Sequence, residues 1–134
     1  MEGERWDDFN VVVTRLSHPA LIDLYTAKKI QYTYYLLKID PGTAYSTFKN
    51  KGGNCTAIEA FQRYCLIKNG YKAVPLEVES RGAGTHAITK FWVPEIDGFF
   101  LMDNGNLFPK GILGPFRNME ESGYKLSRYK KNIY

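Results

Sequence analysis

Cysteine and histidine are scarce in this chain of 134 residues, which contains two of each. The two cysteines, Cys55 and Cys65, cannot form a disulfide framework. On one helix they would lie about 15 Å apart, beyond the reach of a disulfide bond. Free thiols are typical of a reducing compartment, so we expect packing or chemistry from them rather than a cross-link.

Long hydrophobic runs are also missing. No apolar stretch is long enough to cross a bilayer, and the first nine residues, MEGERWDDF, are too polar and acidic for a signal peptide. We therefore expect a cytoplasmic protein without a membrane partner. The length and the 44% of hydrophobic residues fit a single domain that covers residues 1–134.

The excess of positive charge is small, with 18 Lys and Arg against 14 Asp and Glu. The basic residues are spread along the chain, and they gather only in the final stretch YKLSRYKKNIY, residues 124–134. We interpret this stretch as a solvated edge strand or a frayed terminus rather than a surface for nucleic acid. A nucleic-acid partner is not expected, and the sequence leaves the oligomeric state open.

A first helix is predicted over residues 18–30. Ser17 stands at the N-cap position and Pro19 in the first turn, where both residue types are common. Leu21, Leu24 and Tyr25 recur at helical spacing and should face the core. The following residues are predicted to be extended up to a turn at 40–42, and STFKNKGG has room for one helical turn.

The clearest helix covers residues 55–69. Its apolar side chains recur every three or four residues, Asn54 is a good N-cap, and Gly70 is a good stop signal. Three runs rich in β-branched and aromatic residues follow, at 72–78, 86–93 and 99–104. A helix followed by consecutive antiparallel strands predicts an α+β domain, with the helix packed on one face of a small sheet.

Cys55 occupies a position that favours a thiolate. It lies in the first turn of this helix, where unpaired backbone N–H groups and the helix dipole stabilise an anion. Such surroundings lower the pKa of a cysteine from about 8.5 toward neutrality. Gly52 and Gly53 would leave room for a substrate backbone. The alternative is a small buried residue at a helix start, with glycines that serve only the turn.

Of the two histidines, His86 is the better candidate for a base. His18 precedes a proline at a helix start, where a surface or capping role is expected. His86 opens one predicted strand, and Asp103 closes the next. If they are cross-strand neighbours, the carboxylate would accept the Nδ1 hydrogen of His86 and turn the ring toward the thiol.

The turn between these two strands decides whether the pair forms. A midpoint between Pro94 and Glu95 would set positions 86 and 103 directly opposite each other on one face. A later midpoint, near Ile96, would need a bulge at Gly98 to restore the alignment. Asp97 is the competing carboxylate, but its place before a glycine favours a turn role.

Two stretches, GGNCTAIEAFQRYCLIKNGYKAVPLEV and THAITKFWVPEIDGFFLMDNG, resemble the core of the transglutaminase-like superfamily. The resemblance extends over roughly residues 18–105. It implies a papain-like fold, with the nucleophile helix on a small antiparallel sheet, and a catalytic triad of Cys55, His86 and Asp103. The superfamily includes transglutaminases, peptide N-glycanases, predicted microbial cysteine proteases and members without the chemistry.

The resulting expectation is a cysteine enzyme that acts on peptide or isopeptide amide bonds through an acyl-thioenzyme, by hydrolysis or by transfer. A peptide or protein would be the substrate, and no cofactor is expected. Gly53, Asn54 and Trp92 are predicted to bind the substrate. The backbone N–H of Cys55 would stabilise the oxyanion, with Asn54, Tyr45 or Trp92 as the second donor.

Three alternatives remain open. The domain could be a binding module that keeps the fold without using the thiol. The loop KGGNC is also similar to the cysteine loop of arylamine N-acetyltransferases, which are much longer proteins. A metal site built from Cys55, His86 and Asp103 is a poor zinc set, because its ligands are mixed and none are closely spaced. No metal is therefore expected.

Overall fold

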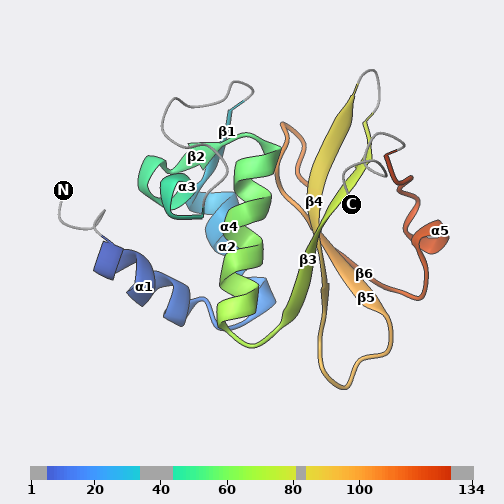
Figure 1. Cartoon of the computed structure of the whole chain (residues 1–134), viewed down its shortest axis with the longest axis horizontal. Helices are drawn as coiled ribbons and strands as arrows, with labels where there is room; N and C mark the ends of the chain where they lie inside the picture. Colours follow the sequence, from blue (N-terminus) through green and yellow to red (C-terminus); the bar gives the residue numbers. More distant parts are fainter. Residues whose placement is uncertain (1–5, 34–43, 81–83, 128–134) are drawn as a thin grey trace.

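The computed structural model of the chain describes residues 6–33, 44–80 and 84–127. Within these ranges it has an α+β fold, as predicted, with the helices of residues 6–68 on one side of a four-stranded antiparallel sheet and a short C-terminal helix on the other (Figure 1). The elements are α1 (Trp6–Arg15), α2 (Pro19–Lys29), β1 (Gln31–Tyr32), α3 (Ala44–Asn50), β2 (Gly52–Gly53), α4 (Cys55–Lys68), β3 (Lys72–Glu79), β4 (Thr85–Trp92), β5 (Phe99–Asp103), β6 (Gly111–Phe116) and α5 (Met119–Ser122). The predicted turn at 40–42 lies outside the described residues. None of the described helices is long and apolar enough to cross a membrane.

The start of α2 differs from the prediction by one residue. The N-cap is His18 rather than Ser17, because the Nδ1 atom of His18 accepts a hydrogen bond from the backbone N–H of Ala20 at 3.1 Å. The expected capping role of His18 is therefore confirmed. The imidazole of His18 caps the first turn of α2.

The buried face of α2 is only partly the predicted one, because Tyr25 packs against the helical core as expected but the two leucines do not. Ile22 and Thr26 are buried, whereas Leu21 and Leu24 are 42% and 50% exposed. Burial of Thr26 costs little because its hydroxyl donates to the carbonyl of Ile22 at 2.8 Å. The hydrogen bond to the carbonyl of Ile22 allows Thr26 to face the core, whereas the sequence pattern had predicted that Leu21 and Leu24 would do so.

The helix α4 agrees with its prediction. The Oδ1 atom of Asn54 accepts from the backbone N–H of Ala57 at 3.0 Å, which caps the first turn. At the other end Asn69 is the C-cap, and Gly70 has a φ of +93°, a conformation that favours glycine. The helix α4 contacts β3, β4 and the helices α1, α2 and α3, so this helix forms the centre of the domain.

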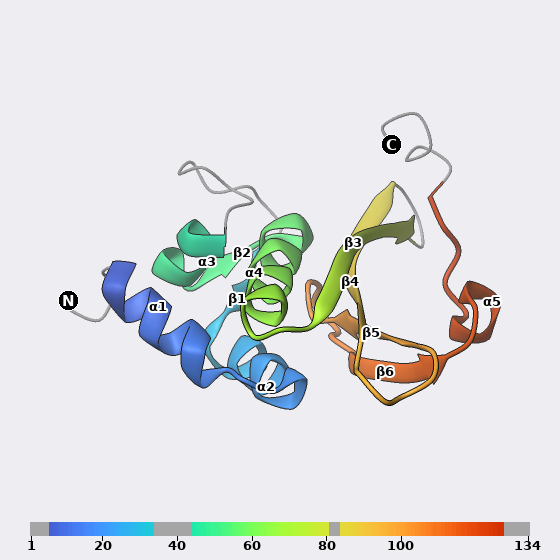
Figure 2. The same ribbon diagram turned by 60° about the horizontal axis from the view of Figure 1, so that its bottom comes forward.

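The sheet has the order β3-β4-β5-β6, and neighbouring strands are antiparallel. The three predicted strands lie within one residue of their expected bounds, while β6 and the helices α1 and α5 were not predicted. Figure 2 shows the twist of the sheet, which turns the β3–β4 pair away from the β5–β6 pair.

Hydrophobic clusters lie on both faces of the sheet. The face toward α4 contributes Ala73, Phe91 and Met102 to the larger cluster, which includes the helices. The opposite face carries a second cluster, made of Leu76, Val78, Ile88, Phe99 and Leu101. Side chains from the C-terminal part of the chain, among them Phe116, Met119 and Tyr124, cover this second cluster.

Residues 125–127 extend the outer edge of β3. The backbone N–H of Glu79 donates to the carbonyl of Lys125 at 2.7 Å, and the N–H of Ser127 donates to the carbonyl of Glu77 at 3.0 Å. Leu126 forms an isolated antiparallel bridge with Val78. These residues therefore pair with the sheet edge instead of fraying, although they form an isolated bridge and not a full strand, and 128–134 lie outside the described part.

Candidate active site

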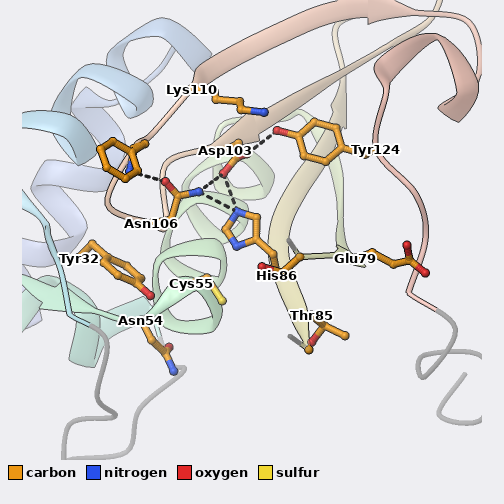
Figure 3. Close-up of a pocket in the computed structure, with 14 residues that line it drawn as sticks. Tyr32, Asn54, Cys55, Glu79, Thr85, His86, Asp103, Asn106, Lys110 and Tyr124 are labelled. Carbon is orange, nitrogen blue, oxygen red and sulfur yellow. Dashed lines mark hydrogen bonds and ion pairs between the residues drawn. The ribbon is translucent and has the colours of Figure 1, made fainter. Parts of the chain in front are cut away.

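A cleft of about 840 Å³ opens where the N-terminus of α4 meets the ends of β4 and β5 (Figure 3). Its volume suits a small molecule or a short stretch of peptide. Cys55, His86 and Asp103 all line it. The other lining residues are Tyr32, Asn54, Glu79, Ser80, Gly84, Thr85, Gly105, Asn106, Phe108, Lys110 and Tyr124.

Cys55 lies half-buried in the first turn of α4 and hydrogen-bonds with His86 and the backbone N–H of Ala87. Burial alone would raise the pKa of the thiol. The hydrogen bond from His86, the N–H of Ala87, the positive charge of His86 and the hydroxyl of Thr56 outweigh burial, so that the pKa of Cys55 is lowered. The site therefore favours the thiolate.

His86 connects the thiol to the carboxylate. Its Nε2 atom lies 2.7 Å from Oδ1 of Asp103, and its other ring nitrogen faces Cys55 (Figure 3). Burial would lower the pKa of the imidazole. The hydrogen bonds with Asp103 and Cys55 and the negative charges of both groups raise it instead, to about 9. At neutral pH the imidazole is therefore protonated, and its positive charge favours the thiolate of Cys55.

The ring of His86 is oriented the other way round from our prediction, which gave Nδ1 to the carboxylate. The sulfur of Cys55 also contacts the backbone N–H of Ala87, so the thiol lies close to the backbone of β4. Nδ1 is the ring nitrogen nearer to the backbone and therefore faces the thiol. Nε2, at the far end of the ring, is left to reach Asp103.

The register of the β4–β5 hairpin also differs from the predicted one. Thr89 pairs with Met102 and Phe91 with Phe100, so the turn is centred between Glu95 and Ile96. Position 103 then faces position 88 rather than 86. Because side chains alternate along a strand, a shift of two positions keeps 86 and 103 on the same face as diagonal neighbours. The hydrogen bond forms diagonally, without the bulge proposed at Gly98.

Asp103 is surrounded by hydrogen-bond donors. Oδ1 accepts from His86, with Asn106 Nδ2 at 3.5 Å, and Oδ2 accepts from the hydroxyl of Tyr124. Burial would raise the pKa of the carboxyl group. The hydrogen bonds from His86 and Tyr124 and the charges of His86 and Lys110 lower it, so Asp103 is ionised. Sequence reasoning missed Tyr124 and Asn106, although Asn106 stands in the NGN turn directly after Asp103.

A buried polar network fixes the loop that follows Asp103. The side-chain amide of Gln62, in α4, donates to Oδ1 of Asn104 at 2.8 Å. The amide of Asn104 in turn donates to Oδ1 of Asp23, in α2, at 2.8 Å. The end of β5 is thereby tied to both helices, which limits how far Asp103 can move from the start of α4.

Glycines allow close contacts around Cys55. A Cβ atom at Gly105 would lie 2.7 Å from the Cα of Cys55, and one at Gly53 would lie 2.6 Å from the Cβ of Ala57. Gly53 also pairs with Tyr32 in the parallel β1–β2 ribbon. The structure thus shows Gly53 making room for the first turn of α4, and a contact between Gly53 and substrate stays a prediction.

The other predicted site residues lie in different places. Asn54 lines the cleft, but Trp92 and Tyr45 do not. Trp92 lies at the far end of β4, where the ammonium groups of Lys72 and Lys90 are 4.9 and 5.2 Å from its ring. Tyr45 packs against Phe9 in the helical core, with 5.6 Å between ring centroids. Because neither lines the cleft, neither is placed to donate to an oxyanion there.

Over the described ranges, no group of three or more His, Cys, Asp or Glu side chains has the arrangement to hold a metal ion. Cys55, His86 and Asp103 are joined in a line through the imidazole instead of converging on one point. The geometry is that of a hydrogen-bonded relay between a thiol and a carboxylate.

No known family model matches the chain. The chain is similar to the UDP-N-acetylglucosamine transferase subunit ALG13 of Mus musculus, with 30% identity over 95 residues. The aligned part is 71% of this chain and 6% of the mouse protein. The chain therefore spans only a small fraction of the curated relative that it matches.

Proposed function

We propose that this protein is a cysteine-nucleophile enzyme with a papain-like, transglutaminase-type core that acts on peptide or isopeptide amide bonds. The observation that carries the proposal is the position of His86, which contacts Cys55 with one ring nitrogen and Asp103 with the other. A nucleophile, a base and an orienting carboxylate in this order are the minimum set for acyl transfer.

The first half of the reaction forms an acyl-thioenzyme. The thiolate of Cys55 attacks the carbonyl carbon of the amide, and the carbonyl oxygen takes up the negative charge. The imidazolium of His86 then gives its proton to the amide nitrogen, the C–N bond breaks, and an amine leaves. Asp103, ionised and hydrogen-bonded to Nε2, stabilises the imidazolium until this proton is transferred.

The second half releases the acyl group. The neutral imidazole takes a proton from water or from a second amine, which attacks the thioester carbonyl and displaces the sulfur. Water gives a carboxylic acid, and an amine gives a new amide. The same three side chains serve both outcomes, so hydrolysis and transfer are both within the proposal.

The oxyanion would be stabilised at the start of α4. The backbone N–H of Cys55 is in the first turn of the helix, where the partial positive charge of the helix end is greatest. Asn54 is the second donor that we propose. Its Oδ1 is occupied by the N–H of Ala57, which leaves the amide hydrogens as the groups that can face the cleft.

A peptide or protein of a reducing compartment such as the cytoplasm is the proposed substrate, because both cysteines of the chain are free thiols. The similarity to ALG13 does not add glycosyl transfer to the proposal. It covers 6% of that protein, and the cleft residues described above are the groups expected for acyl chemistry rather than for a sugar nucleotide.

The decisive experiment is selective labelling of the two thiols. Iodoacetamide at neutral pH should alkylate Cys55 rapidly, whereas Cys65 is fully buried and burial raises its pKa to about 12. Cys55→Ala should abolish native-state labelling, and Cys65→Ala should preserve it. Mass spectrometry of the labelled peptides reads out both variants.

A panel of acyl electrophiles with amide, ester and thioester leaving groups then tests catalysis. A covalent acyl adduct on Cys55 that disappears in water, or more quickly with an added amine, would support the proposal and separate hydrolysis from transfer. If Cys55 labels no faster than an ordinary exposed thiol and forms no acyl adduct, the domain is a binding module and the enzyme proposal is wrong.

A further inference from the structure

We infer that Tyr124 is a positioning residue of this site, whose hydroxyl holds the carboxylate of Asp103 in the orientation that keeps His86 aligned with Cys55. The inference rests on the proposed function and extends the relay from three residues to four. Tyr124 comes from the C-terminal end of the described chain, and the resemblance over residues 18–105 does not include it.

The two oxygens of Asp103 are divided between two donors. Oδ1 accepts from His86 Nε2 at 2.7 Å, and Oδ2 accepts from the phenol of Tyr124. The side chain of Asp103 is 2% exposed, so water has little access to either oxygen. With both oxygens engaged by groups on different parts of the fold, rotation of the carboxylate about its Cβ–Cγ bond is blocked.

Other polar groups could draw the carboxylate away from His86 in the absence of this hydroxyl. The amide of Asn106 is 3.5 Å from Oδ1, and the same amide is 3.3 Å from Nε2 of His86. Lys110 is near enough for its charge to lower the pKa of Asp103. Tyr124 therefore selects one of several orientations that a buried carboxylate could take here.

The backbone around Tyr124 is fixed on both sides. Before it, Gly123 ends α5 with a φ of +82°, and the N–H of Tyr124 donates to the hydroxyl oxygen of Ser122 at 3.1 Å. After it, residues 125–127 pair with the edge of β3. The same β3 residue that bridges to Leu126, Val78, also pairs with His86 in β4.

The ring of Tyr124 is held independently of its hydroxyl. It is partly buried against the second hydrophobic cluster. The ammonium of Lys110 lies 5.2 Å from the ring centroid, a cation–π distance. Removal of the hydroxyl alone should therefore leave the ring in place, and Tyr124→Phe separates positioning from packing.

Two effects of the hydroxyl on His86 have opposite signs, and this makes the test decisive. A hydrogen bond to Oδ2 makes the carboxylate less basic, so on electrostatic grounds alone its removal would raise the pKa of His86. If the hydroxyl positions Asp103, its removal lets the carboxylate turn, weakens the contact with Nε2 and lowers the pKa of His86. The direction of the change distinguishes the two roles.

The experiment compares Tyr124→Phe with wild type by NMR titration of the His86 imidazole and by alkylation of Cys55 with iodoacetamide at about pH 6. We expect a lower imidazole pKa and an alkylation rate reduced by up to about tenfold, the equivalent of one pKa unit. Tyr71→Phe is the matched control, because Tyr71 packs against the helical core and does not line the cleft.

An unchanged or raised imidazole pKa in Tyr124→Phe, with wild-type alkylation, would overturn the positioning role even if the variant were less stable. This failure is distinguishable from failure of the proposed function. In the first case wild-type Cys55 is still rapidly alkylated, and it slows in His86→Ala. In the second case wild-type Cys55 itself shows no enhanced reactivity.

Discussion

The helix α4 carries two cysteines whose surroundings differ in almost every respect. Cys55, at its first residue, lies half-buried at a cleft, and its pKa is lowered by hydrogen bonds that outweigh burial. Cys65, about three turns later, is fully buried in the core, and burial alone raises its pKa to about 12. The two thiols share a helix and a chemical identity.

Burial alone does not decide the pKa of a thiol in this fold, because the hydrogen-bonding and charged groups beside the sulfur can outweigh it. Burial is the largest single influence on both pKa values, and it acts in the same direction on each. Only Cys55 has an imidazole and free backbone N–H groups within reach. The opposite pKa shifts of the two thiols are thus set by β4 and the helix start rather than by exposure.

Removal of the His86 imidazole should have the largest effect on the difference between Cys55 and Cys65. His86→Ala should reduce turnover of an acyl substrate by roughly 10⁶-fold, by analogy with the histidine of a serine-protease triad. Alkylation of Cys55 at about pH 6 should slow by roughly 10²-fold, because the thiol pKa returns toward about 8.5 and the thiolate fraction falls accordingly.

The rate of alkylation against pH checks the sign of this effect. In wild type the rate should rise at a lower pH than for an ordinary thiol, because the pKa of Cys55 is lowered. In His86→Ala the rate should rise only near the ordinary thiol pKa. His18→Ala is the control, since His18 caps α2 and does not line the cleft. Equal profiles for both variants would contradict the triad.

The next largest effect is expected from the carboxylate. Asp103→Asn should reduce turnover by roughly 10²- to 10⁴-fold while the fold stays intact, because the imidazolium loses its charged partner. Asp97→Asn, in the exposed turn after β4, should have little effect. Both variants need a thermal unfolding curve beside the activity measurement.

A different result would reassign Asp103. If it served only the turn that follows, Asp103→Asn would cost about 1 kcal/mol of unfolding free energy and leave the reactivity of Cys55 unchanged. Loss of reactivity in Asp97→Asn would show that the wrong carboxylate has been paired with His86.

The smallest effects are expected from glycine-to-alanine changes beside the two ends of α4. Gly105→Ala places a Cβ atom 2.7 Å from the Cα of Cys55, so the loop or the helix start must shift. We expect a loss of about 1–3 kcal/mol in unfolding free energy and a slower alkylation of Cys55. Chemical denaturation and alkylation kinetics measure the two effects on the same preparation.

Gly70→Ala is the matched change near Cys65. Nothing lies within 4 Å of a Cβ atom at Gly70, but its φ of +93° strains any other residue. It should lower stability without changing the reactivity of Cys55. If both glycine variants left alkylation at the wild-type rate, the contact between Gly105 and Cys55 would have no part in positioning the thiol.

The sequence was sufficient to predict α4, the strands β3 to β5 and three of the side chains that meet at the cleft, Cys55, His86 and Asp103. These depend on local signals, such as the Asn54 cap and the alternation along each strand. It was insufficient for the hydrogen-bonding nitrogen of His86, the register of the hairpin and the contact of Tyr124 with Asp103. Each depends on where separate elements meet in space, and no short-range pattern records that.

The errors in α2 have the same origin. Leucines at helical spacing suggested one buried face, but the helix buries Ile22 and Thr26 because of what α4 offers on the other side. The amide of Gln62 lies 3.3 Å from the hydroxyl of Thr26, a contact between residues 36 positions apart. Periodicity identified the helix, and tertiary polar contacts selected its face.

The diagonal contact between His86 and Asp103 has a consequence for how the β4–β5 turn can change in length. Sliding β5 along β4 by two residues would keep Asp103 on the face of His86, whereas sliding it by one residue would send the carboxylate to the opposite face, toward α4. The hydrogen bonds from Gln62 to Asn104 and from Asn104 to Asp23 hold the end of β5 to α4 and α2. A change in the length of the exposed turn at 94–97 is therefore expected to alter the loop and to leave the register at the cleft in place.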